Sequence, residues 1–358
     1  MNKSVSSQFK QTVSKVGTIG LGSLGLILLV ALCLWALGIP IIKGFSLLWE
    51  GAAGDKFALS QTLVRATPLL CTGVGVCIAW KSGAFNIGGE GQLLMGALAS
   101  AALGKLLLNS GIGQFGTFLM LLTSGFFGAI WASLATWIAQ RRGVDLVIAT
   151  ILMNFIADKL LFWGVDGPLK RAGEISPQTD TLPDAMMLWR PSRQTDLHLG
   201  VVIAILLAIA AGVWLYRTRS GYLTRVVGEN PRFARTNRVD ANKVQMRAMM
   251  LSGMICGFAG GIQYLGINGQ LGSTFSQQYG FLGIPVALVA ALNPIGAIFS
   301  SLFFGGLFAA TSNLARFAQV GNAFVYIIQA SAVLGLLIYR YLSKIQSQKS
   351  QLTTSEEA

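Results

Sequence analysis

One short stretch of the chain combines backbone freedom with an ionisable side chain in otherwise apolar surroundings. The run from Lys81 to Gly96 holds five glycines and the carboxylate of Glu90. A carboxylate at membrane depth is tolerated only where protein or water surrounds it, and non-helical backbone has the same requirement. We therefore expect this run to break a membrane span beside the path of a solute.

Two roles are open for Glu90. It either lines the path and holds exposed backbone amides of the broken helix, or it is solvated at the membrane interface near Lys81. We favour the first role because an unpaired carboxylate in lipid is costly. The run is not a phosphate-binding loop, since a Walker A loop needs Gly-Lys followed by Ser or Thr, and Gly104-Lys105 precedes Leu106.

Further polar residues occur within apolar spans and are candidates for a hydrophilic route. Each could equally be an interhelical hydrogen-bonding group. Asp158 and Lys159 are adjacent, so they point in different directions on a helix and their mutual pairing is not assured. The predicted path-lining residues are Asn86, Glu90, Gln92, Asn154, Gln263, Asn268 and Asn293.

Enzymatic and metal-binding functions have little support in the sequence. His198 is the single histidine, which excludes a two-histidine metal motif, and we expect it to be solvated at the outer edge of a span. We expect no catalytic residue, metal, cofactor or nucleic-acid partner, because basic cytoplasmic loops explain the net charge of +13. The cysteines lack CxxC spacing and are predicted to be buried hydrophobic residues: Cys33, Cys71, Cys77 and Cys256.

The composition is that of an integral membrane protein. Hydrophobic residues make up 53% of the chain and charged residues 11%, whereas soluble proteins carry about a quarter charged residues. A span needs about 20 apolar residues, and the sequence predicts an all-α, multi-pass protein of the cell membrane with about ten transmembrane helices, some short or broken. The predicted spans lie near 17–42, 62–80, 84–108, 114–139, 144–163, 197–216, 247–268, 281–292, 295–312 and 322–341.

The basic residues predict the sidedness of these spans. The tail 1–16 is basic and the first span lacks a signal-peptide cleavage site, so we expect a cytoplasmic N-terminus. Ten spans then place Lys81, the basic block 217–247 and the C-terminus in the cytoplasm as well. This count requires two short antiparallel helices in 281–312, where Asn293-Pro294 disfavours a continuous helix.

Small residues and internal similarity indicate how the spans are organised. Gly253, Gly257 and Gly261 recur every four residues, a spacing typical of close helix packing. A weak similarity between residues 84–88 and 291–296 is consistent with duplicated halves or with chance. The predicted divisions are a cytoplasmic tail 1–16, a first transmembrane half 17–163, an extracytoplasmic loop 164–196, a second transmembrane half 197–342 that includes the coupling loop 217–247, and a cytoplasmic tail 343–358.

Several motifs together resemble the membrane permeases of ATP-binding cassette (ABC) importers for nucleosides and simple sugars. The similarity extends from about residue 45 to 340. It implies a cytoplasmic ABC ATPase subunit, a second related permease, and an extracytoplasmic substrate-binding lipoprotein as partners. The motifs are Phe45-Ser-Leu-Leu-Trp-Glu-Gly51, Thr67-Pro-Leu-Leu-Cys-Thr-Gly-Val-Gly75, Ser82-Gly-Ala-Phe-Asn-Ile-Gly-Gly-Glu-Gly-Gln92, Gly143-Val-Asp-Leu-Val-Ile-Ala-Thr-Ile-Leu-Met-Asn154 and Val227-Gly-Glu-Asn-Pro231.

The resemblance implies that a short cytoplasmic helix contacts the ATPase. Asn230-Pro231 independently predicts a helix start, because proline is favoured in the first turn. The alternative is that this basic block only anchors the chain on anionic membrane lipids. The predicted coupling residues are Gly228, Glu229, Asn230, Pro231, Arg232, Phe233, Ala234 and Arg235.

We therefore expect a permease subunit of an ABC importer, with ATP hydrolysed on a separate subunit. The resemblance favours a nucleoside over a simple sugar as the solute. The alternative is an ion-coupled secondary transporter that uses Glu90 or Asp158 as its coupling carboxylate.

Overall fold

The computed structural model describes residues 38–192, 194–275 and 277–318, together with 27, 28, 30–32, 34, 35, 327, 330, 331, 334 and 335. Apart from two isolated β-bridges, all regular secondary structure of the described residues is helical, so the all-α prediction is confirmed. Most of the predicted spans 17–42 and 322–341 and both tails lie outside the described residues.

The chain separates into two units of dense internal contact, residues 59–306 and the residues that flank them. The flanking unit contains α2 (Ile41–Trp49) and η1 (Glu50–Gly54). Its small core is built from Val30, Leu34 and Leu314. The amide of Asn313 donates to the Leu47 carbonyl at 2.8 Å, which joins the N-terminal and C-terminal parts of this unit.

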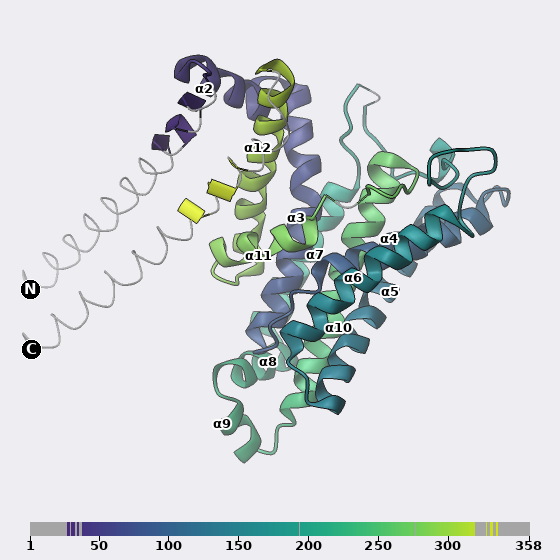
Figure 1. Ribbon diagram of the computed structural model, residues 1–358. Helices are drawn as coiled ribbons and strands as arrows, with labels where there is room; N and C mark the ends of the chain where they lie inside the picture. The colour runs from purple at the N-terminus through teal and green to yellow at the C-terminus, as the bar shows by residue number, and fades with distance from the viewer. Residues whose placement is uncertain are drawn as a thin grey trace, which may run out of the picture. The chain divides into compact units, whose positions relative to one another are not determined.

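The larger unit contains the elements that position the candidate site (Figure 1). Of the described helices, six are long and apolar enough to span a membrane, and they establish a multi-pass protein. The total of about ten spans stays a prediction. The helices are α3 (Lys56–Lys81), α4 (Gly89–Leu107), α5 (Gly113–Arg142), α6 (Leu146–Asp166), α7 (Gly200–Arg217), α8 (Arg219–Glu229), α9 (Pro231–Thr236), α10 (Ala241–Gln263) with its π-helical extension η3 (Tyr264–Asn268), α11 (Tyr279–Val289) and α12 (Pro294–Ala318).

Helices α4, α5 and α10 form the densest contacts of this unit through small residues. A side chain at Gly257 would overlap the Ser124 carbonyl of α5, and one at Gly253 would overlap the Gly128 carbonyl. Gly261 lies against the Ser124 side chain in the same way. The predicted packing role of this glycine series is confirmed, because only hydrogen at these positions lets the two backbones approach.

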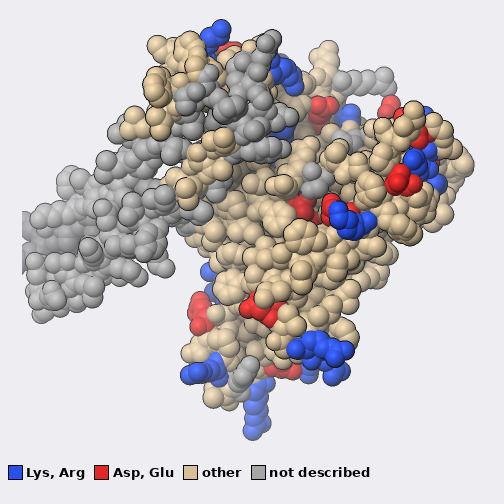
Figure 2. Space-filling view, in the orientation of Figure 1, with Lys and Arg blue, Asp and Glu red and all other residues tan. Residues whose placement is uncertain are grey.

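The larger unit has two chemically different ends. We call the first of these the basic end. It contains the C-terminal ends of α3, α5 and α7, together with α8, α9 and the start of α10. Figure 2 shows Lys and Arg side chains clustered there. At the opposite, loop end, residues 167–192 and 194–199 cover the helix ends, and the Gln114 amide of α5 donates to the carbonyls of Ala185 and Met187.

The long connection at the loop end is ordered largely without helix, as its prolines predict. Its bridges pair Lys170 with Thr179, and Gln178 with Gly272 of the segment that precedes α11. His198 corrects an expectation, because it is 2% exposed rather than solvated. Its Nδ1 accepts the Gly200 N–H at 3.1 Å, and burial lowers its pKa to about 4.

Residues 281–312 form a hairpin whose arms are unequal. The predicted helices 281–292 and 295–312 are observed as the 11-residue α11 and the 25-residue α12. The Oδ1 of Asn293 accepts the Ile295 N–H at 3.0 Å and starts α12. The Ser300 hydroxyl donates to the Val286 carbonyl at 2.9 Å, so the arms pack side by side and antiparallel.

Candidate functional site

The glycine-rich run joins two helices instead of breaking one, which corrects the expected span 84–108. We call residues 82–88 the link. Helix α3 ends because the N–H groups of Ser82 and Gly83 turn back to the carbonyls of Ala79 and Trp80. Gly83 has φ +77°, a left-handed conformation that glycine adopts without strain. Helix α4 then begins at Gly89, one residue before Glu90.

Asn86 organises the link from within. Its Oδ1 accepts the Gly88 N–H at 2.8 Å and the Gln92 amide at 3.1 Å. Its Nδ2 donates to the Ser252 hydroxyl of α10 at 3.0 Å. The Trp80 indole donates to the Asn86 carbonyl at 3.1 Å. These bonds satisfy a non-helical backbone that is buried away from water.

Asn154 supports the link from α6. Its Oδ1 accepts the Gly91 N–H at 2.8 Å, and its Nδ2 donates to the Ile87 carbonyl at 2.9 Å. The Thr150 hydroxyl, one turn earlier, accepts the Ile87 N–H at 3.3 Å. Because one side chain both accepts and donates here, Asn154 fixes the link against α6.

Glu90 connects the start of α4 to the start of α11. Its Oε2 accepts the Gly280 N–H at 2.7 Å, and the residue is only 4% exposed. The solvated interpretation of Glu90 is therefore wrong. The carboxylate lies in the first turn of α4 and at the first turn of α11, so it meets the positive ends of two helix dipoles.

Helix α11 begins deep within the larger unit. The Thr72 hydroxyl of α3 bonds to the Tyr279 carbonyl at 3.0 Å. Thr72 lies nine residues before the end of α3 at Lys81, which at 1.5 Å per residue is about 14 Å from the basic end. Helix α11 then runs toward the basic end, where Ala287 packs with Val76 and Cys77.

The segment that precedes α11 is not helical. Leu271 pairs with Thr179 at the loop end, and the chain reaches the first turn of α11 only eight residues later. Described residues 271–275 and 277–278 form no helix. Irregular backbone at membrane depth must be buried in protein or line a water-filled space, and such breaks are typical of solute sites in transporters.

The predicted path residues do not all lie together. Asn86, Glu90, Gln92 and Asn154 converge on the link. Gln263 is buried at the end of α10 and Asn293 starts α12, while the Asn268 side chain lies outside the described residues. Their role in solute passage stays a prediction. Asp158 and Lys159 do pair, at 3.1 Å, on an exposed face of α6.

Sequence reasoning missed three polar residues near the start of α11. Arg65 lies in α3 two helical turns before Thr72, whose hydroxyl donates to the Tyr279 carbonyl. Gln277 and Gln278 precede α11 and are exposed, and Gln277 accepts the Tyr279 hydroxyl at 2.8 Å. An arginine inside a predicted span and a Gln-Gln pair before an apolar helix were the available signals.

The predicted helix start at the basic end is confirmed. The Asn230 Oδ1 accepts the Phe233 N–H at 3.0 Å, and Pro231 is the first residue of α9. Proline suits this position because the first helical N–H groups have no intrahelical partner. Phe233 is 56% exposed, and the Arg235 side chain lies outside the described residues. A short helix therefore presents an aromatic ring at the surface.

A close backbone contact joins Gly228, the first of the predicted coupling residues, to the link. A side chain at Gly228 would overlap the Lys81 carbonyl and would lie 3.0 Å from the Gly83 nitrogen. The Gln245 amide of α10 donates to the Ser82 carbonyl at 3.3 Å. Around this contact, Val227, Ala234, Ala241 and Val244 form a buried cluster that fixes α9 between α8 and α10.

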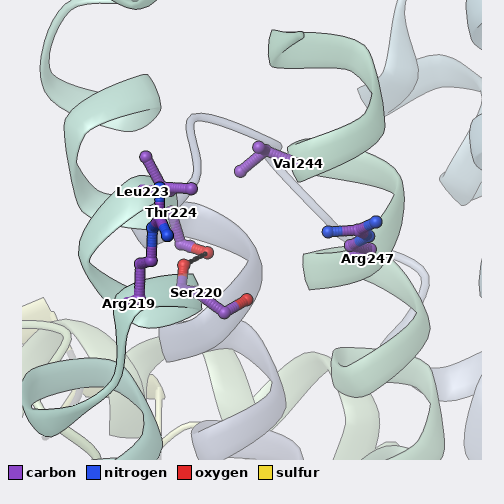
Figure 3. A pocket seen from close by; sticks show the side chains of 6 residues that line it. All are labelled: Arg219, Ser220, Leu223, Thr224, Val244 and Arg247. Atoms are coloured by element: carbon purple, nitrogen blue, oxygen red, sulfur yellow. Dashed lines mark hydrogen bonds between the residues drawn. The ribbon is translucent and has the colours of Figure 1, made fainter. Parts of the chain in front are cut away.

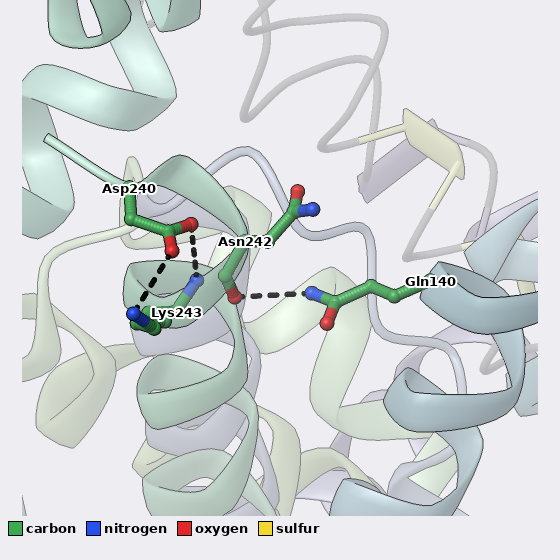
Figure 4. A network of polar contacts seen from close by, with 4 residues as sticks. All are labelled: Gln140, Asp240, Asn242 and Lys243. Atoms are coloured by element: carbon green, nitrogen blue, oxygen red, sulfur yellow. Dashed lines mark hydrogen bonds and ion pairs between the residues drawn. The ribbon is translucent and has the colours of Figure 1, made fainter. Parts of the chain in front are cut away.

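Two hollows flank α10 at the basic end. One lies between α8 and α10, with Arg219 and Arg247 on its two sides (Figure 3). Neither arginine pairs with a carboxylate of the described chain. The other lies between α10 and α5, where the Gln140 amide donates to the Asn242 carbonyl at 3.0 Å (Figure 4).

Asp240 starts α10 beside the second hollow. Its Oδ1 accepts the Lys243 N–H at 3.2 Å and its Oδ2 lies 3.4 Å from the Lys243 ammonium, as Figure 4 shows. The backbone N–H of Lys243 is the main reason that the pKa of Asp240 is below its usual range. The basic end thus combines two surface hollows with an excess of unpaired positive charge.

Comparison with known proteins gives this geometry a context. Residues 58–341 match the sequence profile of a family described as "Branched-chain amino acid transport system / permease component". The glucose ABC transporter permease protein TsgB13 of Haloferax volcanii is 29% identical over 319 residues, with 86% of this chain and 83% of the relative covered. The guanosine ABC transporter permease protein NupP of Bacillus subtilis is 29% identical over 323 residues, with 88% and 89% covered. The nucleoside ABC transporter permease protein NupB of Lactococcus lactis is 25% identical over 347 residues, with 92% and 93% covered.

Proposed function

Because the chain belongs to the family of permease components of branched-chain amino acid transport systems, we propose that it is the permease subunit of an ABC importer for a nucleoside. The names of NupP and NupB support a nucleoside, and that of TsgB13 keeps a simple sugar as the second choice. The assembly contains this chain, a second related permease, an ATPase and a binding protein.

The ATPase docks on α9. The observation that carries this assignment is a capped helix that exposes Phe233 and is bound to its neighbours by a buried cluster. An exposed aromatic ring flanked by basic residues suits a protein interface better than a lipid anchor, since aromatic and arginine residues are enriched in interfaces. The hollows beside α10 extend the same surface.

The solute enters at the loop end and passes beside the link. Two features support this route: the non-helical segment before α11, and the polar framework of Asn86, Glu90, Gln92 and Asn154. The ordered loop 167–199 offers the surface on which a binding protein releases its solute. ATP-driven movement of α9 then reaches the link through the Gly228 contact.

The ion-coupled alternative is less well supported. Glu90 is occupied by the Gly280 N–H, and Asp158 is paired with Lys159. A coupling carboxylate has to bind and release its ion during each cycle, which both of these bonds oppose. Solute uptake driven by a proton or sodium gradient in proteoliposomes that lack the ATPase would favour this alternative and overturn the ABC assignment.

Removal of the exposed ring of α9 tests the docking assignment. We expect Phe233→Ala to weaken ATPase binding and to reduce ATP-driven nucleoside uptake at least about tenfold, as expected for an aromatic residue at the centre of an interface. The reconstituted assembly supplies the uptake measurement, and co-purification of the ATPase supplies the binding measurement.

The matched control is Val144→Ala, which shortens an exposed apolar side chain at the basic end but outside α9. Both variants should insert into the membrane and purify like the unaltered protein. Uptake and co-purification that are the same for Phe233→Ala as for Val144→Ala would reject α9 as the docking helix.

A further inference from the structure

The Nε of Arg65 is an enclosed donor with no acceptor among the described residues. The residue as a whole is only partly buried, and it takes part in none of the ion pairs among the described residues. Most of the apolar stretch of α3 is buried in the protein, at 83%, so this helix belongs to the interior and not to the lipid surface. A donor group enclosed there without a partner is costly, so it requires an explanation.

Two other arginines with an unbonded Nε show what a satisfied guanidinium looks like in this protein. Arg190 donates from its Nη2 to the carbonyls of Gly266 and Ile267, at 2.7 and 3.1 Å. Arg225 lies over the rings of Tyr216 and Tyr222, at 5.2 and 6.0 Å. Arg65 has neither kind of support among the described residues.

The position of Arg65 is on the proposed route. It lies one helical turn from Gln61, whose amide donates to Asp196 of the loop end at 2.6 Å. It is 16 residues before Lys81, or about 24 Å from the basic end along the helix. Thr72, two helical turns further along the same face of α3, donates to the carbonyl of Tyr279, the first residue of α11, and exposed Gln277 and Gln278 immediately precede that residue.

We propose that Arg65 binds the transported solute directly, through two adjacent hydrogen-bond acceptors, and that Gln277 contributes at the same level. This inference rests on the proposed importer function. The guanidinium is a rigid, planar fork of donors that matches paired acceptors better than a lysine does. A nucleoside carries such a pair in two places: on the edge of a purine base, at O6 and N7, or in the vicinal hydroxyls of its sugar.

The need for reversible binding also explains why the Arg65 Nε has no partner within the protein. A site that is satisfied by its own protein would have to break internal bonds for each solute molecule. A donor that the protein leaves unpaired breaks no internal hydrogen bond when it takes up the solute, so that binding stays reversible during transport.

The test uses the complete assembly in proteoliposomes with saturating ATP, and compares unaltered protein, Arg65→Gln and Arg65→Lys. We expect Arg65→Gln to raise the solute concentration for half-maximal uptake at least about tenfold, because charge-assisted hydrogen bonds are lost. Arg65→Lys keeps the charge but not the fork, and should give an intermediate value. Arg316→Gln, which removes an exposed arginine of α12, is the matched control and should have no effect.

Pairs of solutes identify which acceptors are bound. If Arg65 binds the base edge, the Arg65→Gln effect will be large for inosine and small for adenosine, whose exocyclic amine replaces O6. If it binds the sugar, the effect will be equal for both bases and absent for the 2′-deoxynucleosides. Either pattern supports the direct contact.

Unchanged half-saturation for every solute in Arg65→Gln would overturn the proposal. If Arg65→Gln fails to purify as a folded protein, Arg65→Lys and Gln277→Ala provide the same half-saturation measurement. Failure of the unaltered assembly to show ATP-driven uptake is a different result, since it would reject the importer function itself.

Discussion

Single residues in this protein hold parts of the chain that are distant in sequence. Glu90 and Gly280 are 190 positions apart, yet the carboxylate of one bonds the backbone N–H of the other at 2.7 Å. The side-chain amides of Asn86 and Asn154 each accept one hydrogen bond and donate another at or beside the link. Polar groups at these positions therefore determine the backbone geometry first, and any contact with solute depends on that geometry.

Substitution of Glu90 tests what this residue supplies. Glu90→Gln can still accept the Gly280 N–H, whereas Glu90→Leu leaves that group buried and unbonded. We expect Glu90→Leu to lower the free energy of unfolding by about 1–3 kcal/mol, and Glu90→Gln to lower it less. Thermal unfolding of the detergent-purified protein measures both, and Glu229→Leu, an exposed carboxylate, is the control. Equal losses in the two Glu90 variants would show that the negative charge itself is required.

His198 predicts a pH dependence at the loop end. Burial, together with the nearby charge of Arg190, lowers its pKa to about 4, so the folded protein holds the neutral ring. The unfolded chain binds a proton below its ordinary pKa of about 6.5. The stability contribution is therefore complete above about pH 6.5 and is lost as the pH falls toward 4, since the unfolded state binds more protons in that window.

A non-titrating variant isolates this effect. His198→Asn keeps an acceptor for the Gly200 N–H and removes the only histidine of the chain. Between pH 7 and 5 we expect the unaltered protein to lose roughly 1–2 kcal/mol more unfolding free energy than His198→Asn. Parallel pH profiles for the two proteins would mean that His198 does not remain neutral in the folded state.

At the scale of elements, close backbone contacts determine which helices move together. Glycines let α10 pack on α5 and let the end of α8 pack on the end of α3. Both contacts require glycine, because a larger side chain would keep the two backbones apart. Neither contact requires a specific side-chain hydrogen bond. The second contact connects α9, through Gly228, to the link that carries Asn86.

Gly228→Ala tests this connection. The added methyl group would overlap the Lys81 carbonyl and force α8 away from α3 and the link. We expect ATP-driven uptake to fall at least about fivefold, while the ATPase still binds and hydrolyses ATP, because a coupling free energy of 1–3 kcal/mol is typical between linked sites. The reconstituted assembly measures uptake and phosphate release in parallel.

The control for this experiment is Tyr222→Phe, which removes only a hydroxyl from an exposed ring of α8. It changes the same helix without entering the contact with α3. Loss of hydrolysis together with uptake in Gly228→Ala would indicate failed docking, and full uptake would show that the contact transmits nothing.

At the scale of the whole molecule, chemistry is divided between two ends. The basic end carries unpaired arginines, two hollows and α9, and the loop end carries an ordered polar connection and a neutral buried histidine. The link and α11 lie between them, so that one buried polar framework contacts elements that lead to both ends. An importer needs this division, because energy and solute reach it from opposite sides of the membrane.

Local rules allowed the sequence by itself to determine much of this protein. Hydropathy predicted a helical membrane protein, the glycine series predicted a packed face of α10, and Asn230-Pro231 predicted the start of α9. Each of these depends on residues within one helix or one turn, where spacing and capping are sufficient.

Only the tertiary structure decided what depends on packing between distant segments. It placed Glu90 on Gly280, ended α3 before the link, buried His198, and enclosed the Nε of Arg65 without a hydrogen-bond partner among the described residues. Whether a polar side chain lines a path or supports a backbone depends on which unbonded N–H or carbonyl group packing brings within about 3 Å of it, and spacing along the sequence does not encode that distance.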